Sequence, residues 1–169
     1  MSSKNDKFYL KLALNLAKQN EGLTRENPSV GCVIVKDNEI LSLSKTSING
    51  RPHAEVNAIR LANTKDLKGS TIYVTMEPCT HHGKTPPCTD LIIKKKISKI
   101  VYASNDIDER TAKKLKKVLK NHNISTKQIR MKEITDFYKS YFFIRKNKFP
   151  YITAKLACSN DYFIYSKKN

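Results

Sequence analysis

The sequence has no apolar stretch long enough to cross a membrane, and its start, MSSKNDKFYL, lacks the short apolar run of a secretory signal. These two absences predict a cytoplasmic protein that does not bind membranes. Internal repeats and low-complexity linkers are also missing. The 169 residues are enough for one domain with a real core, and a second full domain does not fit.

Acidic residues are scarce: 15 Asp and Glu stand against 32 Lys and Arg, which gives a net charge of +17. A charge of this size is found on nucleic-acid-binding proteins, yet here the excess is almost entirely lysine, spread along the whole chain. Arginine, the usual reader of bases, is rare. We therefore attribute the charge to compositional bias and expect no nucleic-acid partner.

Cysteine is also rare, with four in the chain. In a reducing compartment these are metal ligands, catalytic groups or buried side chains rather than disulfides. Cys32 in VGCVIV and Cys158 in KLACS have the pattern of small buried hydrophobes. Cys79 and Cys88 differ, because they stand at the two ends of the stiff polar loop EPCTHHGKTPPC.

Apolar spacing predicts helices and strands in alternation, which indicates an α/β sandwich with helices on both faces of a sheet. In the helix over 54–63, Val56, Ile59 and Ala62 are the expected inward positions. The other expected helices are 6–20, 86–96, 110–121 and 133–146, and the expected strands are 30–35, 39–46, 70–76, 99–104, a short one at 123–126, and 149–159.

Two sequence segments together predict a metal centre. In PHAEVNAIR, His53 and Glu55 stand at the start of a helix, while Cys79 follows a strand and Cys88 opens another helix. A helix start favours thiolate over thiol, the form that binds metal. One imidazole and two thiolates suit zinc and leave a fourth position for water. Glu55 is placed as the base that takes a proton from that water.

Each of these residues also has a purely structural interpretation. His53 could be a buried, hydrogen-bonded histidine, and Glu55 could be a carboxylate that stabilises its helix. Cys79 and Cys88 could close a structural zinc knuckle with His81 and His82. The knuckle needs no Glu55, whereas the combination of H-x-E, a strand ending in E-P-C and a second cysteine matches the signature of zinc deaminases. We favour the catalytic interpretation.

The chain resembles the deaminase domain of the bifunctional riboflavin biosynthesis deaminase/reductase over roughly residues 8–157. The resemblance rests on NPSVGCVIVKD (27–37), PHAEVNAI (52–59) and EPCTHHGKTPPCTDLI (77–92). Eight residues separate the two cysteines of the last motif. Most cytidine and tRNA deaminases are expected to have a much shorter spacer, so this spacing favours the riboflavin branch.

The resemblance implies a three-layer α/β/α cytidine deaminase-like fold with a central mixed sheet. It implies hydrolytic removal of the 2-amino group of 2,5-diamino-6-ribosylamino-4(3H)-pyrimidinone 5′-phosphate by a zinc enzyme, which we expect to be a homo-oligomer. The residues that match the family's roles are His53, Cys79 and Cys88 as zinc ligands, Glu55 as proton shuttle, and Asn27, His81 and Lys84 as substrate contacts, with Lys84 reaching the phosphate.

Two segments depart from the family's pattern. In NDIDERTAKKL, Asp106 is kept but Asp108 stands where asparagine is common, and the usual glycines are missing; Arg110 or Thr111 would have to compensate. We expect a deaminase domain over 1–148, followed by 149–169, which resembles the opening strand of a reductase domain with Tyr162 in place of glycine. Either this tail is vestigial or the reductase is a separate or missing polypeptide.

Two other functions stay open at this point. A tRNA adenosine deaminase is favoured by the net charge alone, and its expected short cysteine spacer is absent. A zinc-stabilised binding module would need a closed metal site and no Glu55.

Overall fold

The computed structural model describes residues 3–62 and 66–164. The chain divides into two units, with the boundary between Lys139 and Ser140. The first unit holds a mixed sheet whose five described strands run in the order β2-β1-β3-β4-β5. β1 is antiparallel to β2 and β3, whereas β3, β4 and β5 are parallel. The strands are β1 (Gly31–Lys36), β2 (Glu39–Lys45), β3 (Thr71–Met76), β4 (Lys99–Ser104) and β5 (Ser125–Gln128).

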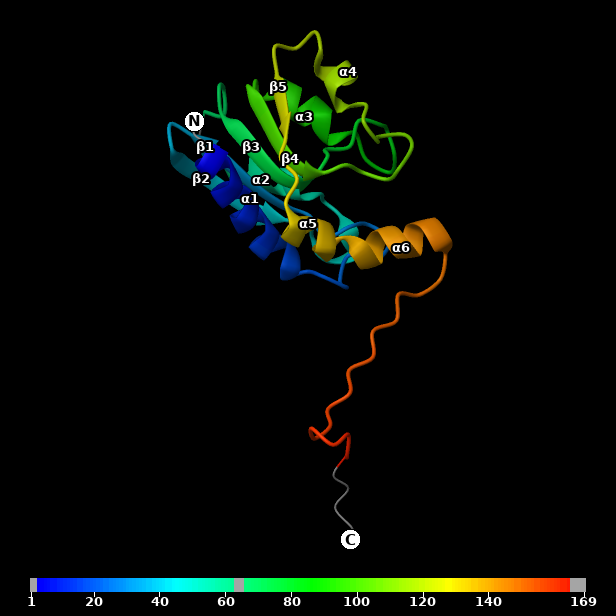
Figure 1. Ribbon diagram of the computed structural model, residues 1–169. Coiled ribbons are helices and arrows are strands. Elements are labelled where there is room, and N and C mark those ends of the chain that lie inside the picture. Colours follow the sequence, from blue (N-terminus) through cyan, green and yellow to red (C-terminus); the bar gives the residue numbers. More distant parts are fainter. Residues whose placement is uncertain (1–2, 63–65, 165–169) are drawn as a thin grey trace. The chain divides into compact units, whose positions relative to one another are not determined.

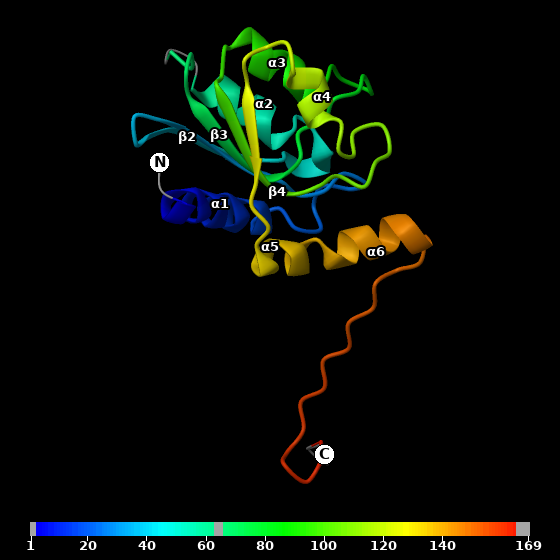
Figure 2. The ribbon, with the colours of Figure 1, turned by 45° about the horizontal axis from the view of Figure 1, so that its top comes forward.

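Helices cover both faces of this sheet, which confirms the predicted three layers. α1 (Ser3–Lys18) and α5 (Lys132–Phe137) lie on one face; α2 (Ala54–Leu61), α3 (Cys88–Lys94) and α4 (Leu115–Leu119) lie on the other (Figures 1 and 2). The short 3-10 helix η1 (Ile48–Gly50) precedes α2. α1 lies so close to β1 that a Cβ at Gly31 would come within 1.8 Å of the Ala13 carbonyl oxygen.

A buried carboxylate joins α1 to the sheet. Asp6 accepts hydrogen bonds from the Tyr73 hydroxyl at 2.9 Å and from Lys127 Nζ at 2.7 Å. Burial acts to raise the pKa of Asp6, but these two hydrogen bonds and the charges of Lys99 and Lys127 outweigh it and lower the pKa. Asp6 is therefore ionised in the folded protein and ties the first helix to β3 and β5.

The predicted helix over 110–121 was wrong in its first half, since α4 begins at Leu115. Lys113 has a positive φ of 61°, which a helix does not accept. The buried Glu77 side chain accepts the backbone N–H groups of Lys113 at 3.0 Å and Leu115 at 3.3 Å. These bonds hold the segment before α4 as a turn.

The predicted helix over 133–146 is two helices, α5 and α6 (Lys139–Asn147), separated at Tyr138. Tyr138 is buried, and its hydroxyl donates to the Ser29 carbonyl oxygen at 3.0 Å and lies 2.6 Å from Thr75 Oγ1. The inward turn of this anchoring residue ends α5.

The predicted helix over 54–63 ends at Leu61, with Asn63 outside the described residues. In it Ile59 and Ala62 are buried as expected, but Val56 is only half-buried.

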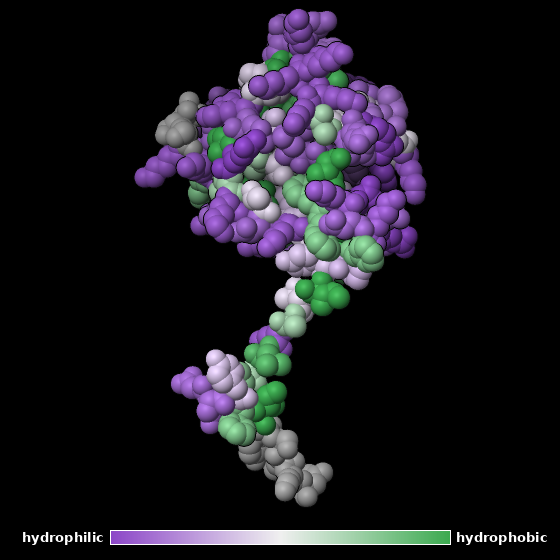
Figure 3. Space-filling model, turned by 45° about the vertical axis from the view of Figure 1, so that its right-hand side comes forward, coloured by the Kyte–Doolittle hydropathy of each residue, from purple (hydrophilic) through white to green (hydrophobic). Residues whose placement is uncertain are grey.

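The second unit contains α6 and an extended segment. The predicted strand over 149–159 is wrong, because these residues have no regular secondary structure and no strand of the described chain pairs with them. The prediction that Cys158 is buried is also wrong, since it is exposed. Apolar side chains such as Ile152 and Leu156 are exposed along this segment (Figure 3). None of the described helices is long and apolar enough to cross a membrane.

Candidate active site

Three potential metal ligands meet where two helices begin and one strand ends. His53 is the residue immediately before α2, Cys79 lies three residues beyond the end of β3, and Cys88 is the first residue of α3. His53 Nδ1 lies 3.7 Å from Cys79 Sγ and 3.4 Å from Cys88 Sγ. All three ligand atoms lie within 4.8 Å of one another. The fold thus brings together the three residues that the sequence predicted as ligands.

These distances fit a single zinc ion. Zinc binds imidazole nitrogen at about 2.0–2.1 Å and thiolate sulfur at about 2.3 Å, and tetrahedral geometry then places nitrogen and sulfur about 3.6 Å apart. The observed separations of 3.7 and 3.4 Å lie on either side of this value. One nitrogen and two sulfur donors are also the ligand types that zinc prefers.

The surroundings of the two cysteines favour the thiolate form of one of them, and thiolate is the form that binds metal. A hydrogen bond from Cys88, together with the hydrogen bond and charge of His53, outweighs the effect of burial and lowers the pKa of Cys79 to about 4. The backbone N–H of Cys88, at the start of α3, also donates to Cys79 Sγ at 3.2 Å. The hydrogen bond to Cys79 and burial raise the pKa of Cys88. Cys79 is therefore the thiolate of the pair before a metal arrives.

Glu55 lies beside the ligands in the first turn of α2 and is 4% exposed. Burial raises the pKa of Glu55 to about 7; the charge of His53 opposes this shift, and that of Cys79 adds to it. A buried carboxyl group with a pKa near neutrality can both accept and release a proton. This placement agrees with the predicted role of Glu55 as proton shuttle.

The two histidines of the cysteine loop do not join the ligand cluster. His81 Nδ1 lies 2.8 Å from Thr111 Oγ1, and the exposed His82 lies 3.8 Å from the Asp90 carboxylate. Among the described residues, the one group of three candidate ligands contains His53 instead. The closed knuckle of Cys79 and Cys88 with these two histidines is therefore not the arrangement found.

The predicted substrate contacts lie in the surrounding loops. Asn27 Nδ2 donates to the Gly50 carbonyl oxygen at 3.1 Å, which places Asn27 against the turn that leads to His53. Gly50 has a φ of +87°, and a Cβ there would come within 2.5 Å of Asn27 Nδ2, so this approach requires glycine. Lys84 is exposed in the cysteine loop.

Sequence reasoning missed Arg51. Its Nη1 donates to Thr85 Oγ1 at 2.7 Å, which connects the turn before His53 to the cysteine loop. It also lines a cavity of about 430 Å³, together with His53 and Cys88 among other residues. The signal was present in the sequence, because Arg51 lies only two positions before the first ligand.

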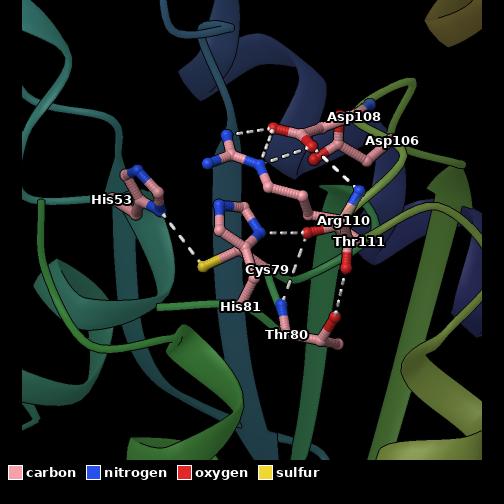
Figure 4. Close-up of polar contacts among 8 residues, drawn as sticks. All are labelled: His53, Cys79, Thr80, His81, Asp106, Asp108, Arg110 and Thr111. Atoms are coloured by element: carbon pink, nitrogen blue, oxygen red, sulfur yellow. Dashed lines mark hydrogen bonds and ion pairs between the residues drawn. The ribbon is translucent and has the colours of Figure 1, made fainter. Parts of the chain in front are cut away.

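The segment that departs from the family's pattern forms its own ion pair. Arg110 Nε donates to Asp108 Oδ1 at 2.9 Å, and Thr111 is fully buried against the cysteine loop (Figure 4). The guanidinium of Arg110 thus balances the charge of Asp108. Thr111, in contrast, is too deeply buried to contact a phosphate from solvent, and its partners are His81 and Thr80.

Comparison with known families agrees with this geometry. Residues 3–104 match the cytidine and deoxycytidylate deaminase zinc-binding region, and this stretch contains His53, Glu55, Cys79 and Cys88. The chain belongs to this deaminase family. Membership in this family agrees with both the predicted α/β fold and the predicted zinc site.

Individual relatives indicate a branch within this deaminase family. The chain is 42% identical to the diaminohydroxyphosphoribosylamino-pyrimidine deaminase of Buchnera aphidicola subsp. Acyrthosiphon pisum, over 86% of this chain and 99% of that protein. It is 43% identical to the riboflavin biosynthesis protein RibD of Aquifex aeolicus, over 92% of this chain but 44% of the relative. This chain therefore spans less than half of the RibD relative and nearly the full length of the Buchnera deaminase.

A solved structure shows the same relationship. The Thermotoga maritima protein described as a diaminohydroxyphosphoribosylaminopyrimidine deaminase/5-amino-6-(5-phosphoribosylamino)uracil reductase superposes with a TM-score of 0.75 at 38% identity. The match covers 85% of this chain and 42% of that protein. The region shared with this two-activity protein is thus less than half of its length.

Proposed function

We propose that this chain is a zinc-dependent deaminase of riboflavin biosynthesis. Its substrate would be 2,5-diamino-6-ribosylamino-4(3H)-pyrimidinone 5′-phosphate, and its products the 5-amino-6-ribosylamino-2,4-pyrimidinedione 5′-phosphate and ammonia. The observation that carries the proposal is the buried Glu55 beside the cluster of His53, Cys79 and Cys88. The substrate class rests on the likeness to the Buchnera deaminase, which covers 86% of this chain and 99% of that protein.

His53, Cys79 and Cys88 would hold the zinc through Nδ1 and the two Sγ atoms. A zinc ion supplies a Lewis acid that lets water act as a nucleophile near neutral pH. The carboxylate of Glu55 takes a proton from the attacking water and later gives a proton to the departing amine. The ring carbon exchanges its bond to nitrogen for one to oxygen, so one water is consumed and one ammonia leaves.

The loops around the cluster would bind the rest of the substrate. Asn27 and His81 offer hydrogen-bonding groups, and Lys84 offers a charge to the phosphate. Arg51 is a second candidate for the phosphate, because it lines the cavity next to His53. These roles, the predicted homo-oligomer and a separate reductase polypeptide stay predictions.

A parallel turnover assay tests the proposal. The zinc-loaded chain is incubated with the diaminopyrimidine phosphate, with cytidine and with a tRNA anticodon stem, and ammonia or inosine formation is measured. We expect turnover of the diaminopyrimidine phosphate alone. Turnover of the tRNA alone would replace this proposal with a tRNA adenosine deaminase, and zinc binding without any turnover would favour a zinc-stabilised binding module.

A further inference from the structure

The buried hydroxyl group of Thr111 needs a hydrogen-bond acceptor, and the proposed reaction gives this residue no role. Thr111 has no exposed surface, so water cannot accept the hydrogen of its hydroxyl. A buried donor left without an acceptor costs about 1–3 kcal/mol. Among the described residues, His81 Nδ1, at 2.8 Å from Thr111 Oγ1, is the one acceptor within hydrogen-bond reach.

The remaining side-chain contact of Thr111 does not take up the hydrogen of its hydroxyl group. The backbone N–H of Thr80 points at Thr111 Oγ1 over a long 3.5 Å, and a backbone N–H can only donate. Thr111 Oγ1 thus accepts from Thr80 and has its own hydrogen to give. The hydroxyl hydrogen therefore points at His81 Nδ1, which must be unprotonated to accept it. A neutral imidazole with unprotonated Nδ1 carries its hydrogen on Nε2.

The chain holds Thr111 in this position from both sides. Its backbone N–H donates to the Asp108 carbonyl oxygen at 2.8 Å. On the other side, the Glu77 carboxylate accepts the N–H groups of Lys113 and Leu115, and the Glu77 N–H donates to the Ser104 carbonyl oxygen at 2.8 Å. Thr111 is thus anchored to the end of β3, the strand that also leads to Cys79.

Among the described residues, no hydrogen bond occupies the other edge of the His81 ring. His81 is half-buried, and in Figure 4 its Nε2 edge points away from Thr111, toward the side on which His53 lies. We propose that Thr111 is a positioning residue that fixes the hydrogen of His81 on Nε2, so that His81 donates a hydrogen bond to an oxygen of the substrate. The substrate part of this inference rests on the proposed function; the position of the hydrogen does not.

Nuclear magnetic resonance tests the position of the hydrogen without turnover. In the zinc-loaded chain labelled with ¹⁵N-histidine, long-range ¹H–¹⁵N spectra distinguish protonated from unprotonated ring nitrogens, and His81→Asn assigns the signals. We expect an unprotonated Nδ1 and a protonated Nε2 in the parent and in Thr111→Ser, and loss of this pattern in Thr111→Val. A protonated Nδ1 in the parent, or an unchanged pattern in Thr111→Val, would overturn the inference.

Kinetics test the role toward the substrate. We expect Thr111→Val to raise KM roughly 3- to 10-fold with kcat nearly unchanged, and Thr111→Ser to restore the parent KM. Thr135→Val, at an exposed threonine of α5, is the matched control. An unchanged KM in Thr111→Val would refute donation to the substrate.

A dephosphorylated substrate identifies the accepting oxygen. An equal rise of KM for both substrates places the acceptor on the pyrimidinone ring or the ribose, and a rise confined to the phosphorylated one places it on the phosphate. If the parent deaminates neither substrate, the proposed function fails, while the spectra still decide the position of the hydrogen.

Discussion

Replacing Glu55 by glutamine separates zinc binding from proton transfer. Glutamine keeps the volume and the shape of the buried side chain but cannot take a proton at neutral pH. Glu55 is 4% exposed, so bulk water cannot readily replace it. Positioned acid–base groups contribute about 10²–10⁴ in rate. Because Glu55 would act both on the attacking water and on the departing amine, we expect kcat to fall at least about 10²-fold and toward the upper end of this range.

The assay follows ammonia release from the diaminopyrimidine phosphate at saturating substrate, with zinc content measured on the same preparation. Glu133→Gln, at an exposed position of α5, is the control and should retain parent activity. Glu55→Gln should bind one zinc per chain like the parent. Turnover within a few-fold of the parent would refute the proton-shuttle role, and loss of zinc would show that Glu55 helps to hold the metal.

Three further predictions concern the metal, the phosphate and the fold. Cys88→Ala should lose zinc in metal analysis while His82→Ala keeps it, and zinc retention by the cysteine variant would contradict the ligand set. Because Lys84 is exposed, Lys84→Ala should raise KM only roughly 2- to 10-fold for the phosphorylated substrate and less for the dephosphorylated one; equal effects on both would reject the phosphate contact. The lowered pKa of Asp6 stabilises the fold above the unfolded pKa of about 4, and this contribution is lost as pH falls through the folded pKa. Asp6→Asn should lower the free energy of unfolding by roughly 1–3 kcal/mol at neutral pH and flatten its decline below about pH 4 in urea titrations; an unchanged acid profile would exclude this role.

Most of the strands and the meeting of the three candidate ligands were predictable because their signals are local. TIYVTM and KIVYAS are short apolar runs between turn residues, and the structure places β3 and β4 within one residue of the predicted bounds. The cluster of His53, Cys79 and Cys88 was predictable because few residue types bind zinc and each stands at the expected start or end of an element.

The remaining features depend on contacts between distant residues. Nothing near Lys113 in the sequence shows that Glu77, 36 positions earlier, accepts its N–H and ends the helical pattern. The break at Tyr138 likewise depends on Ser29 and Thr75, which lie in other elements. The role of Arg51 required knowing that Thr85 lies beside it. The segment over 149–159 has the composition of a strand but no described strand to pair with, so composition alone gave the wrong prediction.

The most direct test of hydrolytic deamination by this chain is the identity of the product formed in ¹⁸O-labelled water. The zinc-loaded chain is incubated with the diaminopyrimidine phosphate, without NADPH, and the product is analysed by mass spectrometry together with the released ammonia. Hydrolytic deamination predicts one ammonia per substrate consumed and one ¹⁸O atom at the ring carbon that lost the amine. Unlabelled product, or no product from a chain that carries its full zinc, would contradict hydrolytic deamination at this site.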